Sequence, residues 1–352
     1  MGTKNLRNRA LRPLAMRRPS AERGSLAQPT YADPKPTQVH RATWLSYLLL
    51  TRPDHWIKNI FMLPGAAFGL LMVPHAVPNI WGRLVLGVVC ACLASAANYV
   101  VNEWLDRSFD RFHPSKKHRM SVLHQLRGEI VWVEYAALVL IALALAYQIS
   151  VYFLCGIALL MIMGVLYNVQ PMRTKDRAYL DVLSEAINNP IRLLLGWFLV
   201  NSSYLPPSSL LLAYWMGGCF LMTVKRYSEL RFIKDPSTAM KYRRSFKFYT
   251  PERLLTCSLF YAVHSALFGG VFLIKYRPEL LFTFPLCALL FSTYLSIGFK
   301  NESAAQHPER LYRERGLMFL LVAFVLSVAA CLYWDFPSIH FIQESAPVRL
   351  MF

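Results

Sequence analysis

The sequence predicts an all-α protein, a polytopic membrane bundle of about nine transmembrane helices around a central cavity open to the cytoplasm. Of its 352 residues, 55% are hydrophobic and only 16% are charged, whereas soluble domains carry about 25% charged residues. Apolar runs of roughly the 20 residues that a spanning helix needs recur along the chain. The basic residues gather in alternate links between these runs, which is the positive-inside pattern of membrane proteins.

The two ends of the chain are predicted to lie outside the bundle. Residues 1–43 are polar and basic and lack the apolar core of a signal peptide. We interpret them as a disordered cytoplasmic tail attracted to anionic lipid, with an organelle transit peptide as the alternative. Residues 335–352 follow the last apolar run and are expected to form an external tail. The bundle itself is expected over residues 44–334.

The spans are predicted from the lengths of the apolar runs. Residues 44–50 are too short to cross a membrane and are expected at its interface. Thr51 and Asp54 resemble a capping box, and Pro53 suits the first turn of the helix that they would open. The expected spans cover residues 53–72, 82–105, 129–148, 151–168, 179–200, 208–229, 253–274, 279–298 and 315–334.

The charge of the links orients these spans. Three links, at 74–80, 148–151 and 200–208, contain no Lys or Arg. The alternate stretches 106–128, 169–178, 225–253 and 300–315 are rich in both. This asymmetry places the charged loops in the cytoplasm, and we expect an integral multi-pass protein of the bacterial cytoplasmic membrane. The net charge of +18 has the same origin, so nucleic acid is not an expected partner.

Polar side chains form a stripe at the cytoplasmic end of the second span. Asn102, Asp106 and Asp110 recur every fourth residue, so they share one helix face. Polar groups within an apolar run cost free energy in lipid, which indicates a function. We predict that these three residues and Glu103 bind Mg²⁺ shared with a substrate phosphate, because Mg²⁺ prefers oxygen ligands. The basic loop that ends at Arg119 would bind phosphate. The alternative is a solvated helix end with paired carboxylates and arginines.

A second stripe begins the fifth span. Asp181, Glu185, Asn188 and Arg192 fall on one narrow helix face. One interpretation pairs the carboxylates with Arg192 as a structural contact between helices. The functional interpretation makes this stripe the opposite wall of a cavity, where it positions sugar hydroxyls or phosphate. The preceding loop adds further cations, among them Lys175.

Two smaller clusters lie at the cytoplasmic ends of other spans. Lys225, Arg226 and Glu229 end the sixth span, where Lys225 and Glu229 would also form an ordinary surface pair. Lys58 and Asn59 begin the first span and are equally ambiguous alone. Because all four polar clusters share one side of the membrane, we expect them to line one cavity.

The run Asn102-Glu103-x-x-Asp106-x-x-x-Asp110 resembles the Asn-Asp-x-x-Asp-x-x-x-Asp motif of the UbiA superfamily of intramembrane prenyltransferases. The resemblance extends over residues 48–334. It implies a helical bundle with a central cavity that opens to the cytoplasm and to lipid. It also implies a membrane-embedded transferase that uses magnesium to draw diphosphate off a donor. Glu103 stands where the family has Asp, which gives the carboxylate a longer reach.

Three stretches are most similar to the decaprenyl-phosphate phosphoribosyltransferase branch of that superfamily. They are residues 52–59, Tyr167 with Lys175 and Asp181, and residues 225–230. This resemblance implies transfer of phosphoribose from phosphoribosyl diphosphate to a polyprenyl phosphate. The second aspartate-rich motif of prenyltransferases is not intact, because two cations have appeared within 225–230. These cations favour a donor that carries an additional phosphate.

The expected reaction gives each group a role. Asp106 and Asp110 are the predicted catalytic residues, which hold Mg²⁺ on the diphosphate while the lipid phosphate attacks the ribose. The predicted substrate-binding residues are Lys58, Asn59, Arg119, Tyr167, Lys175, Asp181, Glu185, Asn188, Lys225, Arg226 and Glu229. The expected partners are a small phosphorylated donor and a lipid with a polyprenyl chain. One alternative is prenyl transfer from a prenyl diphosphate to an aromatic or other small acceptor, and another is a lipid or anion transporter.

Overall fold

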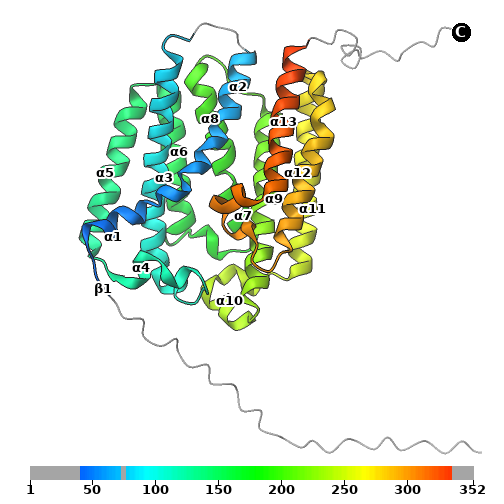
Figure 1. Ribbon diagram of the computed structural model, residues 1–352. Coiled ribbons are helices and arrows are strands. Elements are labelled where there is room, and N and C mark those ends of the chain that lie inside the picture. Colours follow the sequence, from blue (N-terminus) through cyan, green and yellow to red (C-terminus); the bar gives the residue numbers. More distant parts are fainter. Residues whose placement is uncertain (1–39, 73–76, 335–352) are drawn as a thin grey trace, which may run out of the picture. The chain divides into compact units, whose positions relative to one another are not determined.

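A computed structural model describes residues 40–72 and 77–334 (Figure 1). The described chain is almost entirely helical, which confirms the predicted all-α bundle. The tail predicted over residues 335–352 lies outside the described residues, as does nearly all of the tail predicted over residues 1–43.

The elements follow one another as α-helices joined by short 3₁₀ helices, written η. One parallel pair of short strands, β1 (His40–Arg41) and β2 (His124–Gln125), joins two loops. The helices are α1 (Trp44–Leu48), η1 (Leu49–Thr51), η2 (Pro53–Met62), α2 (Leu63–Met72), α3 (Ile80–Asp110), η3 (Lys116–His118), α4 (Met120–Leu123), α5 (Gly128–Tyr147), α6 (Val151–Asn168), η4 (Thr174–Asp176), α7 (Leu180–Ala186), α8 (Asn188–Val200), α9 (Ser208–Ile233), α10 (Pro236–Tyr242), η5 (Arg244–Lys247), α11 (Pro251–Tyr276), η6 (Pro278–Thr283), α12 (Phe284–Gly298), η7 (Ala304–Gln306), η8 (Pro308–Arg313) and α13 (Arg315–Tyr333).

Six stretches of the described chain are long and apolar enough to cross a membrane. They are α3, α5, α6, α11, η6 together with α12, and α13. The other three predicted spans, 53–72, 179–200 and 208–229, are not among these six apolar stretches, so the number nine stays a prediction. Residues 53–72 begin as the 3₁₀ helix η2 and continue as α2, and α9 extends beyond the predicted 208–229.

The fifth predicted span, 179–200, is divided into α7 and α8 at Ile187. Pro190 lies in the first turn of α8, where a missing backbone N–H is tolerated. The same proline cannot donate a hydrogen bond to the carbonyl of Ala186, which fits the end of α7 at that residue. The division therefore has a local cause in the sequence.

The start of the first span also differs from the prediction. The capping box expected from Thr51 and Asp54 is not formed. The Thr51 hydroxyl instead donates to the carbonyl of Leu48 at 2.7 Å. Arg52 precedes η2 in the left-handed region with φ 49°, a conformation uncommon for residues other than glycine.

Two apolar cores organise the bundle. One joins η2, α3, α5, α6 and α8, and the other joins α7, α9, α11, α12 and α13. The helices α7, α8 and α9 pack against one another and connect the two groups. Figure 1 shows α4 and α10 at the same end of the bundle, and α10 also contacts α3. The short helices of two polar loops therefore lie at one end of the bundle.

Glycines allow α2 and α8 to approach closely, as is common in membrane bundles. A Cβ atom on Gly65 would overlap the carbonyl oxygen of Leu193. A Cβ atom on Gly196 would overlap the carbonyl oxygen of Met62. Backbone atoms cannot move aside as a flexible side chain can, so these two positions fix how η2 and α2 lie against α8.

We expect Gly65→Ala to destabilise the bundle by about 1–3 kcal/mol, the usual range for overpacking. The measurement is the midpoint of thermal unfolding in detergent. Gly270→Ala in α11 is the matched control, because a Cβ atom there meets nothing within 4 Å. Equal midpoints for the two variants would contradict the close contact between α2 and α8.

Candidate active site

The carboxylates at the end of α3 face basic side chains from two loops. Asp106 lies 2.8 Å from Nη2 of Arg173 and 2.5 Å from Nζ of Lys175. Asp110 lies 2.6 Å from Nη1 of Arg119. Burial lowers the pKa of Lys175 to about 8, and the carboxylate of Asp106 opposes this shift. The protonated state of Lys175 at neutral pH therefore depends on its partner on α3.

The other two residues of the predicted metal motif, Asn102 and Glu103, also contact basic side chains. The Asn102 side-chain oxygen accepts a hydrogen bond from Lys175 at 3.1 Å. Glu103 is buried, and its Oε1 lies 3.6 Å from Nε of Arg52 and 3.7 Å from Nε of Arg119. Asn102 thus shares a partner with Asp106, whereas Glu103 shares one with Asp110.

The conformation of the loop before α7 places Arg173 and Lys175 against Asp106 on α3. Arg173 has φ 28°, a backbone conformation that costs free energy for a residue with a side chain. Its guanidinium also donates to the carbonyl of Asn168 at 3.0 Å and to Asp176 at 3.1 Å. Lys175 donates to the side chain of Asn168 at 2.7 Å. These contacts hold the strained loop in place.

A closed group of charges forms the opposite wall, and we call Asp181, Glu185, Arg226 and Glu229 the Arg226 cluster. Arg226 is fully buried. Its guanidinium lies 3.1 Å from Asp181 and 3.0 Å from Glu229, and it also donates to Glu185. Three carboxylates around one buried guanidinium exceed its charge, so further cations are needed nearby.

Further donors complete the Arg226 cluster. Asp181 accepts hydrogen bonds from Tyr249 at 2.6 Å and from Ser245 at 3.1 Å. Lys225 lies 3.4 Å from Glu185, whose other oxygen accepts from the Tyr167 hydroxyl at 2.8 Å. Protein donors hold both oxygens of each carboxylate, but Asp181 is fully buried and Glu185 is partly exposed, so Glu185 is the more accessible carboxylate of this wall.

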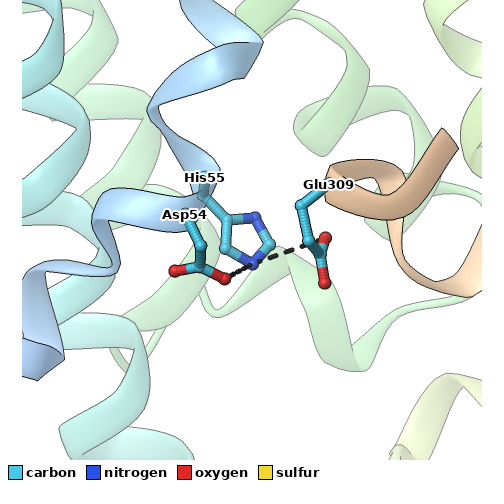
Figure 2. A group of neighbouring side chains, drawn as sticks. All are labelled: Asp54, His55 and Glu309. Atoms are coloured by element: carbon cyan, nitrogen blue, oxygen red, sulfur yellow. Dashed lines mark ion pairs between the residues drawn. The ribbon is translucent and has the colours of Figure 1, made fainter. Parts of the chain in front are cut away.

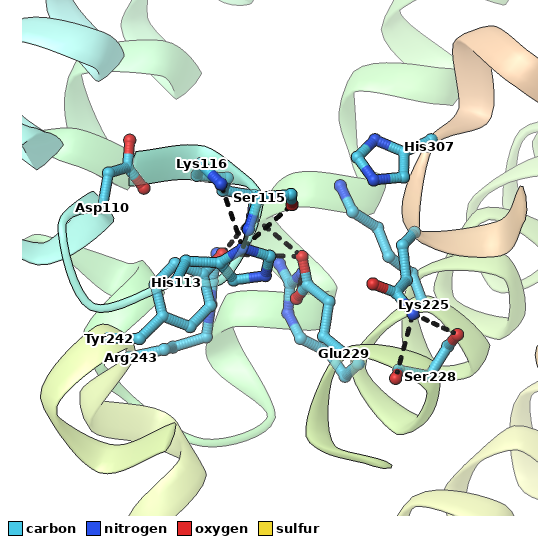
Figure 3. Close-up of polar contacts among 12 residues, drawn as sticks. Asp110, His113, Ser115, Lys116, Lys225, Ser228, Glu229, Tyr242, Arg243 and His307 are labelled. Carbon is cyan, nitrogen blue, oxygen red and sulfur yellow. Dashed lines mark hydrogen bonds and ion pairs between the residues drawn. The ribbon is translucent and has the colours of Figure 1, made fainter. Parts of the chain in front are cut away.

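Lys116 connects the two walls. Its Nζ lies 2.9 Å from Oε1 of Glu229 and also contacts the hydroxyl of Tyr242 on α10. Figure 3 shows Lys116 from the loop after α3 pointing toward Glu229 on α9. Burial opposes the charge on Lys116, but Glu229 more than compensates and raises its pKa. The loop after α3 is therefore fixed to α9 and α10 by charge.

His113 stabilises the loop after α3 through bonds to the loop's own backbone. Its ring is 1% exposed and lies against Tyr242, with ring centroids 4.5 Å apart. Its Nδ1 accepts hydrogen bonds from the backbone N–H groups of Ser115 and Lys116, both at 3.2 Å. Burial, helped by the charge of Lys116, lowers the pKa of His113 to about 3. A proton on Nδ1 would break both bonds.

We expect the neutral His113 to make the protein less stable in acid. The unfolded chain binds this proton below about pH 6.5 and the folded chain only near pH 3, so stability falls as pH falls between those values. At pH 5 the loss from this residue is about 2 kcal/mol. His113→Gln keeps an acceptor that does not titrate, so its unfolding midpoint should fall less from pH 7.5 to pH 5. Equal pH dependence in both proteins would show that His113 does not titrate in this way.

The predicted residues at the start of the first span lie deeper than the carboxylates of α3. The Asn59 oxygen accepts from Nε of Arg192 at 3.0 Å and from Ser95 at 3.3 Å. Arg192 bonds to Asn59 and to the carbonyl of Asn188, and it makes no ion pair with a carboxylate among the described residues. Lys58 lies over the ring of Tyr99, 5.7 Å from its centre.

A pocket opens between the end of α3, the loop before α7 and α10. Its lining residues are Asp106, Phe109, Asp110, Arg173, Lys175, Asp176, Tyr242 and Arg243. The oxygen donors of the two aspartates are of the kind that a hard divalent cation such as Mg²⁺ accepts. Arg173, Tyr242 and Arg243 were not among the predicted binding residues, although all three lie in the basic stretches 169–178 and 225–253. Nothing periodic distinguishes them from their charged neighbours.

Comparisons with known proteins agree with this architecture. A model of the UbiA prenyltransferase family matches residues 62–323. The decaprenyl-phosphate phosphoribosyltransferase of Mycolicibacterium smegmatis is 28% identical over 235 residues, which cover 65% of this chain and 68% of that protein. Nodulation protein NoeC of Azorhizobium caulinodans is 29% identical over 213 residues, which cover 58% of this chain and 64% of that protein.

Solved structures share the fold. A UbiA homolog from Archaeoglobus fulgidus bound to GPP and Mg²⁺ aligns with a TM-score of 0.62 at 21% identity, over 82% of this chain and 100% of that one. A digeranylgeranylglyceryl phosphate synthase aligns with a TM-score of 0.54 at 14% identity, over 82% of this chain and 97% of that one. The apolar helices and the matches together define an integral membrane transferase. The chain belongs to the UbiA prenyltransferase family.

Proposed function

We propose that this transferase moves phosphoribose from phosphoribosyl diphosphate to a polyprenyl phosphate. The observation that carries the proposal is Arg243, which lines the pocket beside Asp106 and Asp110. Its Nε is buried and has no hydrogen-bond partner among the described residues. A buried guanidinium nitrogen without a partner costs free energy, which an anionic oxygen of a substrate would offset.

The metal of the proposed reaction is Mg²⁺, which would be held by Asp106 and Asp110 with the amide oxygen of Asn102. When bound, it would supply Lewis-acid neutralisation of the departing diphosphate. The Archaeoglobus fulgidus homolog was solved with Mg²⁺. Glu103 is held by two arginines, so we assign it to positioning Arg52 and Arg119 at the end of α3.

The cations of the pocket then bind phosphate. Arg173 and Lys175 now neutralise Asp106, and Arg119 neutralises Asp110. If a divalent cation takes over the two carboxylates, these three side chains are free to donate to diphosphate oxygens. Guanidinium groups match phosphate geometry with two parallel donors. Arg243 would bind the additional 5-phosphate that distinguishes this donor from a prenyl diphosphate.

The other wall positions the reactants. We assign ribose hydroxyls to Glu185 and Asn188, and the phosphate of the lipid acceptor to Lys58 and Lys225. Asp181, Arg226 and Glu229 hold these groups in place through the Arg226 cluster. A lipid phosphate is already an anionic nucleophile, so no general base is needed. Catalysis would come from positioning and from electrostatic stabilisation of charge as it develops.

We further propose that the pocket faces the cytoplasm, because the basic loops gather there. The second candidate is prenyl transfer to a small acceptor, since Asp106 and Asp110 alone would serve a prenyl diphosphate equally well. The Mycolicibacterium smegmatis relative is named as a phosphoribosyltransferase that acts on decaprenyl phosphate. That name and the unpartnered Nε of Arg243 favour the phosphoribosyl donor.

Binding of labelled phosphoribosyl diphosphate to purified protein tests the donor. We expect binding with Mg²⁺, its loss with a chelator, and affinity reduced about 10- to 100-fold by Arg243→Gln, the value of a charge-assisted hydrogen bond. Arg253→Gln is the control, because Arg253 is exposed and bonds to the carbonyl of Phe248. The proposed donor would be contradicted if geranyl diphosphate bound more tightly than phosphoribosyl diphosphate and if Arg243→Gln left that tighter binding unchanged.

A further inference from the structure

A separate group of potential ligands joins the beginning and the end of the bundle. Asp54 and His55 lie on η2, and Glu309 lies on η8, which packs against η2. Figure 2 shows the imidazole of His55 between the two carboxylates. Its Nε2 lies 3.4 Å from Oδ2 of Asp54 and 3.6 Å from Oε2 of Glu309. One ligand atom from each residue lies within 4.8 Å of the other two.

Buried polar atoms in this group have no hydrogen-bond partner. His55 is 6% exposed, and neither of its ring nitrogens makes a hydrogen bond within the described part of the chain. Oε2 of Glu309, the oxygen that faces His55, is also buried without one. Such atoms are rare in folded proteins because each costs free energy. Two of these orphaned atoms, Nε2 of His55 and Oε2 of Glu309, lie 3.6 Å apart, which indicates a ligand that would satisfy both together.

The separations fit a small metal ion. Bonds from Zn²⁺ to His nitrogen and carboxylate oxygen measure about 2.0–2.2 Å, so two ligands of a tetrahedral site lie roughly 3.3–3.6 Å apart. The two distances from Nε2 fall in or beside this range. An imidazole with two carboxylates also cancels the charge of a divalent cation. Mg²⁺ prefers oxygen ligands, whereas imidazole suits zinc and related transition metals.

We propose that Asp54, His55 and Glu309 form a binding site for a divalent transition-metal ion of the Zn²⁺ class. The ion would clamp η2, at the start of the first helical segment, to η8, which directly precedes α13. It would be a second metal site in addition to the one assigned to Asp106 and Asp110, and it does not depend on the donor proposed above. Arg52 links this site to α3, because its guanidinium lies 3.4 Å from Asp54 and 3.6 Å from Glu103.

Cobalt is a suitable probe, because Co²⁺ occupies such sites and absorbs visible light. Metal-stripped full-length protein would be titrated with Co²⁺ in excess Mg²⁺, which saturates sites built from oxygen alone. We expect one Co²⁺ per chain, displacement by Zn²⁺, and a higher midpoint of thermal unfolding with metal. His55→Gln and Glu309→Gln should each weaken binding roughly 100-fold. His118→Gln, which removes an exposed imidazole, should bind as the unmodified protein does.

Two binding results would overturn the site. One is the absence of Co²⁺ or Zn²⁺ binding in excess Mg²⁺. The other is equal affinity in the unmodified protein and His55→Gln, which would show that His55 is not a ligand. The X-ray absorption spectrum of the Zn²⁺-loaded unmodified protein is independent of any variant's folding. It should show scattering from an imidazole ligand, and a spectrum from oxygen ligands alone would equally exclude the site.

Discussion

Asp106→Asn and Asp110→Asn are expected to reduce the rate of transfer by roughly 10²–10³-fold each, the largest catalytic effects in this protein. An amide keeps the shape of each side chain but removes the charge needed to hold a divalent cation on the leaving diphosphate. The measurement is initial transfer of labelled phosphoribose to polyprenyl phosphate at saturating Mg²⁺, with donor binding measured in parallel.

Asp235→Asn is the matched control for these variants. Asp235 caps α10 by accepting from the backbone of Ser237 and Thr238, and asparagine caps a helix equally well. Because Asp106 and Asp110 also neutralise buried cations, unfolding midpoints must be compared to separate lost catalysis from lost folding. Full activity in folded Asp106→Asn and Asp110→Asn would remove both residues from the reaction.

Arg226→Met is expected to cause the largest loss of stability. Methionine fills a similar volume but leaves Asp181, Glu185 and Glu229 around an apolar side chain. Removing one partner from a buried ion group costs about 3–5 kcal/mol, because uncompensated charge remains in a medium of low polarity. The midpoint of thermal unfolding in detergent, at pH 7.5, measures this loss.

Two other arginine variants separate the possible causes. Arg231→Met on the same helix should change the midpoint little, since Arg231 is exposed and bonds to the carbonyl of Phe299. Arg226→Lys keeps the charge but cannot reach three carboxylates with a planar fork, so its stability should fall between the two. If Arg226→Met were as stable as Arg231→Met, the Arg226 cluster would not support the fold.

Much of the fold follows from patterns within single segments. The apolar run at 151–168 corresponds to α6 residue for residue, because apolar length alone specifies a spanning helix. The division of 179–200 follows from Pro190, a local signal that hydropathy does not report. Residues 53–72 begin as a 3₁₀ helix, for which apolar periodicity gives no signal.

The candidate site was predictable in part for the same reason. Helical spacing identifies Asp106 and Asp110 as one face, and the pocket does include both. Spacing does not identify what that face meets, because Arg173 comes from a strained loop and Arg243 from the segment after α10. His55 and Glu309 are further apart in sequence than any local pattern extends. Partners across a bundle therefore require the folded structure.

The most direct test of the proposed function compares two transfer reactions. Purified protein in Mg²⁺ would receive labelled phosphoribosyl diphosphate with polyprenyl phosphate, and separately a labelled prenyl diphosphate with aromatic acids. We predict label in the lipid product of the first reaction, and its loss in Asp106→Asn. Product in the second reaction alone would contradict the phosphoribosyl donor and establish prenyl transfer instead.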